Sequence, residues 1–308
     1  MKKILFILLL LVPLLTIAQQ KTYVPDYSFE YQLESLLLGD GIPNNDSVWT
    51  SAIDTVTYFS MDDNIVNYKG IEDFIALEEL YCIGDNQVGG VKYISKLDLS
   101  NNLALTFLYC SDNQIDTLNI SNNLALKVLI CDYMRTPELD VSYNINLEHL
   151  SCKTCFLSNL NLDNNINLKY LNCPNAPLTS LDLSNNPNLE FVKTNYDFSF
   201  NALEYINMRN GNNTNIISFS AVNSPNLACI NVDDSLYSAA SSNWVVDNVS
   251  VFAENCTITS IEEENTDKIK GRTLIKIVDI LGRETKAIRN TLLFYIYQDG
   301  SVEKMMMD

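Results

Sequence analysis

One spacing dominates this sequence: similar residues recur every 21 positions through its middle. Two columns three residues apart hold aliphatic side chains, Leu105, Leu126, Leu147, Leu168 and Leu189 in the first and Leu108, Leu129, Leu150, Leu171 and Val192 in the second. Cysteine fills a third column, at Cys110, Cys131, Cys152 and Cys173. A unit of this length cannot bury its apolar face alone, so the sequence predicts a stack of coils that share a core.

Within one coil, two short segments alternate in polarity as strands do. Leu105–Cys110 is the first segment and Thr117–Ile120 is the second, so we expect two short parallel strands per coil. The corner at Ser121–Asn123 supplies residues that tolerate left-handed backbone and bond nearby peptide groups, which predicts a ladder of stacked asparagines. The cysteine column predicts buried free thiols, because parallel side chains about 4.8 Å apart do not suit a disulfide.

The pattern Leu-x-x-Leu-x-Cys-x-x-Asn-x-Ile-x-x-Leu at Leu105–Leu118 resembles bacterial leucine-rich repeats of the 21-residue kind, as in internalin-type surface proteins. The resemblance covers about residues 53–232 and implies a mostly β fold, a leucine-rich repeat solenoid of short parallel strands. Such a solenoid needs a cap at each end. We expect a short N-terminal capping helix within residues 19–52, where Phe29, Leu33 and Leu36 have helical spacing.

Residues 233–260 are interpreted as the C-terminal cap. Cys229 and Cys256 lie outside the cysteine column and bracket a segment that contains Trp244. In an oxidising compartment they are a candidate disulfide, worth about 3 kcal/mol.

Both ends of the chain are interpreted as export signals. Residues 1–18 have the order of a secretory signal peptide, two lysines followed by a short apolar run. Residues 261–308 resemble the C-terminal sorting domain of the type IX secretion system, through Val278–Arg283 and Tyr295–Gly300. The resemblance implies a small β domain that engages the secretion machinery and a secreted or surface-attached protein. An alternative is a small edge hairpin that belongs to the solenoid cap.

Charge narrows the choice of partner. The chain has a formal net charge of −18, from 38 acidic and 20 basic residues, which disfavours nucleic acid and anionic membrane surfaces. The apolar run of residues 1–18 is shorter than the roughly 20 residues that span a bilayer, so we expect no transmembrane anchor in the mature chain.

The sequence predicts no catalytic, cofactor or metal site. The single histidine, His149, has no serine or cysteine partner implied around it, and Cys152 and Cys155 lack the further ligands that a zinc site needs. A degradative enzyme would require a carboxylate pair in a cleft, which no motif indicates. The chain is therefore interpreted as a non-catalytic protein.

The candidate functional site lies on outward positions between the buried leucines, and its residues are Phe107, Tyr109, Val128, Ile130, His149, Tyr170 and Phe191. These positions form a partly aromatic stripe, a common feature of surfaces that bind an extracellular protein or polysaccharide. The other interpretation is that the rings only stabilise the strand ladder by packing on their neighbours. A structural surface or matrix component without a specific ligand is the alternative function.

Overall fold

The structure is a computed structural model that describes residues 19–60, 64–84, 93–195, 202–256, 274–278, 283, 292–297 and 302–306. The chain divides into two compact units, Met1–Cys256 and Thr257–Asp308. The predicted signal peptide, residues 1–18, lies outside the described residues, as do residues 279–282 and 298–300 of the segments that resemble a sorting domain. None of the helices in the described ranges is long and apolar enough to cross a membrane.

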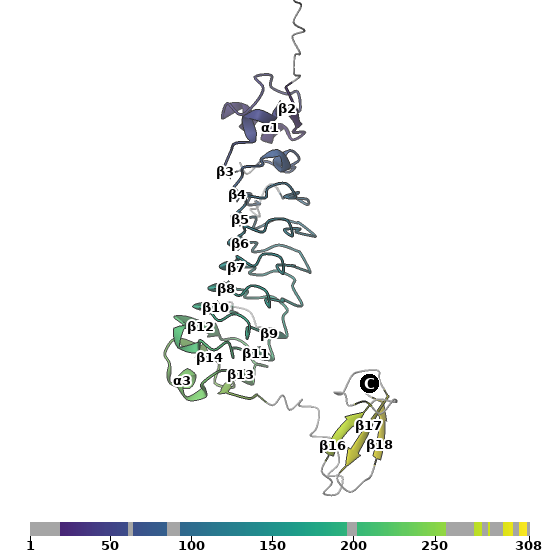
Figure 1. The fold of residues 1–308 in the computed structure, drawn as a ribbon, viewed down its shortest axis with the longest axis vertical. Helices are drawn as coiled ribbons and strands as arrows, with labels where there is room; N and C mark the ends of the chain where they lie inside the picture. Colours follow the sequence, from purple (N-terminus) through teal and green to yellow (C-terminus); the bar gives the residue numbers. More distant parts are fainter. Residues whose placement is uncertain are drawn as a thin grey trace, which may run out of the picture. The chain divides into compact units, whose positions relative to one another are not determined.

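The first unit is a solenoid built on a sheet of nine short parallel strands (Figure 1). In chain order these strands are β3 (Tyr58–Ser60), β4 (Glu79–Tyr81), β5 (Phe107–Tyr109), β6 (Val128–Ile130), β7 (His149–Ser151), β8 (Tyr170–Asn172), β10 (Phe191–Lys193), β12 (Ser218–Ala221) and β14 (Trp244–Val246). From β5 to β10 the register pairs residues 21 positions apart, as Leu108 with Leu129 and Leu150 with Leu171. Residues that share a column of the 21-residue repeat therefore lie next to one another on neighbouring strands.

A second parallel sheet forms on another side of the coils, but only toward the C-terminal end. Its strands are β9 (Ser180–Asp182), β11 (Tyr205–Asn207), β13 (Cys229–Asn231) and β15 (Val251–Ala253). The prediction of two strands in every coil is wrong for the coils from Leu105 to Leu162, where the second segment is buried but is not a strand. Alternating polarity reports which side chains are buried, and it does not require neighbouring backbones to hydrogen-bond.

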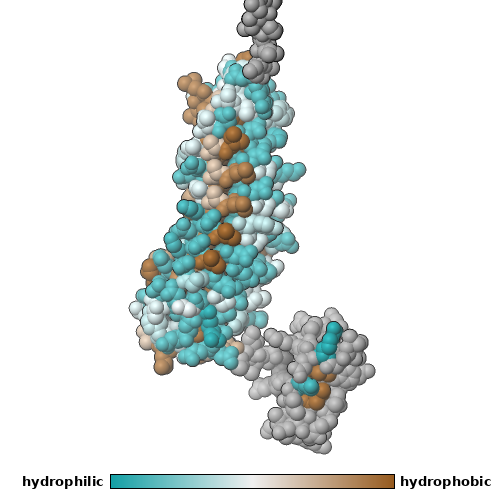
Figure 2. Space-filling view, in the orientation of Figure 1, coloured by the Kyte–Doolittle hydropathy of each residue, from teal (hydrophilic) through white to brown (hydrophobic). Residues whose placement is uncertain are grey.

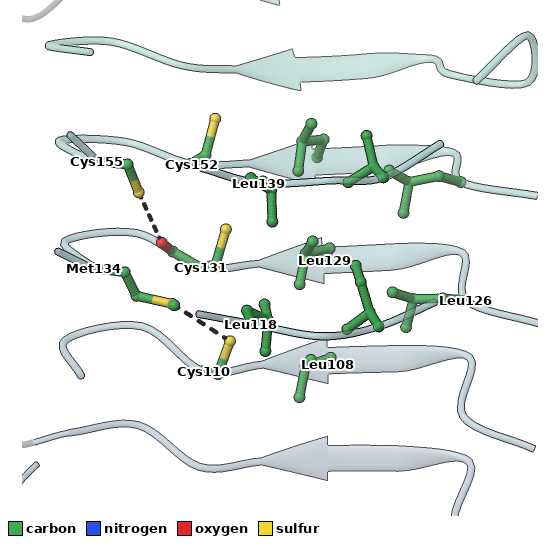
Figure 3. Packing of buried hydrophobic residues seen from close by; sticks show 14 of the residues in the cluster. Leu108, Cys110, Leu118, Leu126, Leu129, Cys131, Met134, Leu139, Cys152 and Cys155 are labelled. Carbon is green, nitrogen blue, oxygen red and sulfur yellow. Dashed lines mark hydrogen bonds between the residues drawn. The ribbon is translucent and has the colours of Figure 1, made fainter. Parts of the chain in front are cut away.

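The core is a stack of aliphatic and thiol side chains between the two walls of the coil. Leucines of both predicted columns are fully buried, and so are Cys110, Cys131 and Cys152. Figure 3 shows these cysteines in equivalent places on successive coils, with Met134 and Cys155 beside them. Six cysteines are free and buried, which confirms the predicted thiols.

The predicted asparagine ladder is also present. The Asn144 side-chain amide donates to the backbone carbonyls of Ile120 and Asn123, at 3.1 and 2.9 Å. The equivalent residues repeat this pair of bonds on the coil before them, and they are Asn102, Asn123, Asn165 and Asn186. Each buried amide thus gives a second donor to two carbonyls at a corner of the preceding coil, which also accept backbone N–H groups.

The N-terminal end is closed by a short helix, as predicted. Helix α1 (Tyr27–Ser35) begins after Asp26, whose carboxylate accepts from the backbone of Ser28 and Phe29 and, through its other oxygen, from Val66. The Phe29 ring lies 5.8 Å from that of Phe59, so the helix covers the first coil. The remaining short elements here are β1 (Lys21–Tyr23), β2 (Ser47–Trp49), α2 (Thr50–Ile53) and η1 (Ile71–Asp73).

At the other end the predicted disulfide joins Cys229 and Cys256, with 5.9 Å between their Cα atoms. The intervening segment contains α3 (Ser235–Ala240), β14 and β15, and η2 (Asn213–Asn215) lies in the coil before it. Strands β14 and β15 extend the two parallel sheets, so the segment interpreted as a cap continues the solenoid.

The second unit contains one antiparallel sheet of β16 (Leu274–Val278), β17 (Leu292–Tyr297) and β18 (Val302–Met306). The small C-terminal β domain of the predicted fold is thus present. Its described strands pair with one another.

Thiol reactivity tests the buried cysteine column. Burial raises the pKa of the Cys173 thiol to about 12 and raises the pKa values of Cys110 and Cys152 well above the ordinary value, so the thiolate is scarce at neutral pH. We expect no reaction of the native protein with a thiol-specific chromophoric reagent. Denaturation should release six reactive thiols, and reduction should add two more. Rapid labelling of the native chain would contradict this assignment.

The asparagine ladder makes a quantitative prediction. Asn144→Ala removes two hydrogen bonds from the core and leaves the Ile120 and Asn123 carbonyls with only their backbone donors, which should lower the free energy of unfolding in urea by about 2 kcal/mol. Asn146 is a matched control on the same coil, since its exposed side chain donates one bond, to the Leu124 carbonyl. Asn146→Ala should cost less than about 1 kcal/mol. Equal losses would show that the buried ladder has no special role.

Candidate functional site

The stripe residues occupy two adjacent columns on the outer face of the nine-stranded sheet. Register places Phe107, Val128, His149, Tyr170 and Phe191 in one column, on β5, β6, β7, β8 and β10. Tyr109 and Ile130 begin the neighbouring column. The spacing of parallel strands, about 4.8 Å, brings each side chain against the next. All seven predicted residues therefore lie on one continuous surface.

The rings of the stripe contact one another and remain partly open to solvent. His149 is exposed and stacks on Tyr170 at 5.4 Å between ring centroids, and Tyr170 lies 6.0 Å from Phe191. Phe107 and Tyr109 are half-buried. Both earlier interpretations are compatible with this geometry, because the rings support one another along the sheet and each still offers a face or an edge to a ligand.

Sequence reasoning missed two members of the stripe. Tyr81 pairs in register with Tyr109 and stacks on Phe107 at 4.8 Å, and Tyr58 lies 5.5 Å from Tyr81. Both precede the strict 21-residue period. Aligning Leu80-Tyr81-Cys82 with Leu108-Tyr109-Cys110 would have placed Tyr81 on the surface. The aromatic surface thus begins at β3, two strands before the predicted start.

The stripe ends where serine replaces the aromatic residues. Ser218 and Ser220 of β12 continue the two columns beyond Phe191 and Lys193. Within the second column, Ser151 is covered by its neighbours: its hydroxyl donates to the Asp132 carboxylate at 2.7 Å and accepts from Asn172 at 2.9 Å. This column therefore changes from aromatic at Tyr81 and Tyr109 to polar at Ser151.

A polar edge borders the stripe just after the strands, and it was not predicted. Asp132 also accepts from the backbone of Lys153, at 2.8 Å. Burial raises the pKa of Asp112, and the negative charge of Asp132 raises it further. Lys153 lies over the ring of Tyr133 at 5.1 Å. Together these four residues, Asp112, Asp132, Tyr133 and Lys153, place carboxylates, an ammonium group and a ring beside Tyr109.

The opposite edge of the stripe carries alternating charges, one per coil. Lys127, Glu148, Lys169 and Glu190 occupy equivalent positions directly before their strands. Lys169 and Glu148 form an ion pair at 2.7 Å, and the hydrogen bond from Lys169 lowers the pKa of Glu148. Both side chains are partly open to solvent, so this pair contributes little to stability. From Lys127 to Glu190 the four charges cancel, and Glu78 occupies the equivalent position before β4.

The described residues contain no group of three or more His, Cys, Asp or Glu side chains placed to hold a metal ion. Cys152 and Cys155 are both buried free thiols, and the Cys155 thiol donates to the Cys131 carbonyl at 3.1 Å. His149 contacts an aromatic ring of the stripe. The arrangement on this surface suits non-covalent recognition through rings and charged groups.

No protein family and no curated protein matches the sequence. Matches among solved structures include three proteins from Listeria monocytogenes. Internalin C2 of strain 4b F2365 has 18% identity over 75% of this chain and 98% of its own, with a TM-score of 0.49. Internalin InlF of the same strain has 19% identity over 77% and 74%, with a TM-score of 0.47. The functional domain of InlJ, which includes a cysteine ladder, has 14% identity over 94% and 99%, with a TM-score of 0.32.

Proposed function

We propose that this chain is a non-catalytic recognition module of the outer cell surface or the extracellular medium, which binds a protein or polysaccharide partner through the aromatic stripe. The observation that carries the proposal is a row of outward side chains with two runs of contacting rings, Tyr58 to Phe107 and His149 to Phe191, joined across β6 by the aliphatic residue Val128. Tyrosine and phenylalanine give large contact areas at low conformational cost, and they are enriched where proteins bind partners.

The supporting frame of the stripe suits a binding surface. Each strand is hydrogen-bonded to the strands on both sides, and its inward side chain is buried, as at Leu108 and Leu150. The outward rings are thus held in fixed places before any partner arrives, which lowers the entropy lost on binding. The carboxylates of Asp112 and Asp132 add hydrogen-bond acceptors for hydroxyl or cationic groups beside the rings.

The disulfide and the two terminal segments support the proposed extracellular location. The disulfide between Cys229 and Cys256 is the kind of bond that persists in oxidising compartments. We further propose that residues 1–18 direct export and that the sheet of β16, β17 and β18 is a sorting domain read by the type IX secretion machinery. In that scheme the mature chain has no transmembrane anchor, and the partner is met outside the cell.

Partner capture by stripe variants tests the proposal. The purified chain is screened against extracellular proteins and polysaccharides, and the triple variant Phe107→Ser, Tyr170→Ser, Phe191→Ser is screened in parallel. We expect capture to fall at least ~100-fold because three anchor rings are lost, each worth about 1 kcal/mol or more. The melting temperature should change little.

Substitution of exposed rings outside the stripe is the matched control. Tyr23→Ser and Tyr27→Ser remove rings that are 58% and 63% exposed and lie outside the stripe, so they should leave capture unchanged. A collapse of stability in the stripe variant, with no change in capture per folded molecule, would favour packing as the only role of the rings. Failure of all partners to bind, together with ordered self-assembly into a matrix, would favour the structural alternative.

A further inference from the structure

A second column of side chains recurs along the solenoid, outside the stripe. In successive coils the residue directly after the buried ladder asparagine is leucine or isoleucine. These four residues, the aliphatic column, are more than half exposed: Leu103 61%, Leu124 54%, Ile145 53% and Ile166 53%. Figure 2 shows hydrophobic surface that recurs from coil to coil along the solenoid. Soluble chains rarely leave so regular a set of large aliphatic residues in water.

The aliphatic column also extends toward the N-terminus. The Asn102 amide donates to the Phe74 carbonyl just as the Asn123 amide donates to the Asn102 carbonyl, so Ile75 is the structural counterpart of Leu103. Ile75 is 57% exposed. At the other end Pro187 follows Asn186 and ends the run of branched side chains. The exposed surface therefore spans five consecutive coils.

Side-chain amides hold this surface in place. Asn146, Asn167 and Asn188 each donate to the backbone carbonyl of an aliphatic-column residue on the preceding coil, at 2.9 to 3.0 Å. On the other side Asn122 and Asn164 bond Ser100 and Ser142 of the preceding coil. The backbone that carries these apolar side chains is therefore held by hydrogen bonds to the neighbouring coils. Little conformational entropy is lost when the surface contacts a partner.

Over the four coils that carry Leu103, Leu124, Ile145 and Ile166 this surface is uncharged, in contrast to the chain as a whole, and at its N-terminal end Asp73 lies two residues before Ile75. Residues 101–105, 122–126, 143–147, 164–168 and 185–189 contain no Asp, Glu, Lys or Arg. Across one flank the alternating residues Lys127, Glu148, Lys169 and Glu190 cancel one another. The other flank is the column of residues 100, 121, 142, 163 and 184, in which Asp163 is the one charged member. A molecule of net charge −18 therefore has a neutral apolar face along its coils.

The lack of charge on this face favours a second copy of the chain as its partner. Two copies of a strongly acidic chain repel each other wherever ordinary surfaces meet, and that repulsion is smallest where both surfaces are uncharged. A basic partner would gain more from the acidic surfaces than from this one. Identical coil spacing also makes the surface complementary to itself, since side chains of one copy can fit between those of another. We propose that the aliphatic column is the contact surface of a homodimer with two-fold symmetry.

Sedimentation velocity of the full chain over a hundredfold range of concentration tests the proposal. We expect a monomer–dimer equilibrium that shifts toward the dimer at high salt, because salt screens the net repulsion between copies and leaves apolar contacts intact. The double variant Leu124→Glu, Ile145→Glu brings like charges together at the contact and should weaken the dimer ~100-fold. Since both positions are more than half exposed, its melting temperature should stay close to that of the parent chain.

A control and a geometric test accompany the variant. Leu236→Glu changes an 82% exposed leucine on α3 and should leave the dimer intact. Leu124→Cys, at the middle of the five-residue column, should form a disulfide-linked dimer under mild oxidation, because residues at the centre of a two-fold contact meet their own copies. Leu236→Cys lies outside the column and should not, and the native free thiols are buried and do not interfere. A monomer at every concentration and salt, or a dimer unaffected by the double variant, would overturn the proposal. Neither outcome bears on partner capture by the stripe, since the two surfaces share no residue.

Discussion

The structure depends on one constraint, that successive coils have the same length and bury matching side chains against each other. Leu108, Leu129, Leu150 and Leu171 lie in register on neighbouring strands, and none of them touches water. A one-residue change in coil length would move the inward side chain to the outer face, because side chains alternate along a strand. The thiols and the ladder asparagines follow from the same constraint, since each position in the period meets copies of itself.

The two proposed surfaces are consequences of this repetition. A residue type that recurs every 21 positions becomes a line of side chains about 4.8 Å apart, so aromatic residues at one outward position become a stripe and aliphatic residues at another become the aliphatic column. The chemistry of each surface is set by one or two positions of the period. The core is unaffected, because outward positions in a solenoid can vary without changing the buried columns.

Much of the fold was predictable because its signals are local and repeated. The period identifies the buried leucines, the free thiols and the ladder asparagines, and helical spacing with Asp26 before it predicts α1. The absence of a second strand from the middle coils was not predictable. Burial of Leu118 and Leu139 produces the same alternation whether or not the neighbouring backbones are hydrogen-bonded. Tyr58 and Tyr81 were missed because 28 residues separate Leu80 from Leu108, which hides their alignment with the repeat.

The exposed residues show where sequence reasoning ends. Leu124 and Leu126 are both leucines two positions apart, yet the first is 54% exposed and the second is fully buried. Which one faces the core depends on the turn made by Asn123, whose amide anchors the corner to the coil before it through the carbonyls of Leu99 and Asn102. Composition places both leucines in the core, and periodicity treats them alike. Only the path of the corner separates a core residue from a surface residue, and the same corner that buries the asparagine turns its neighbour outward.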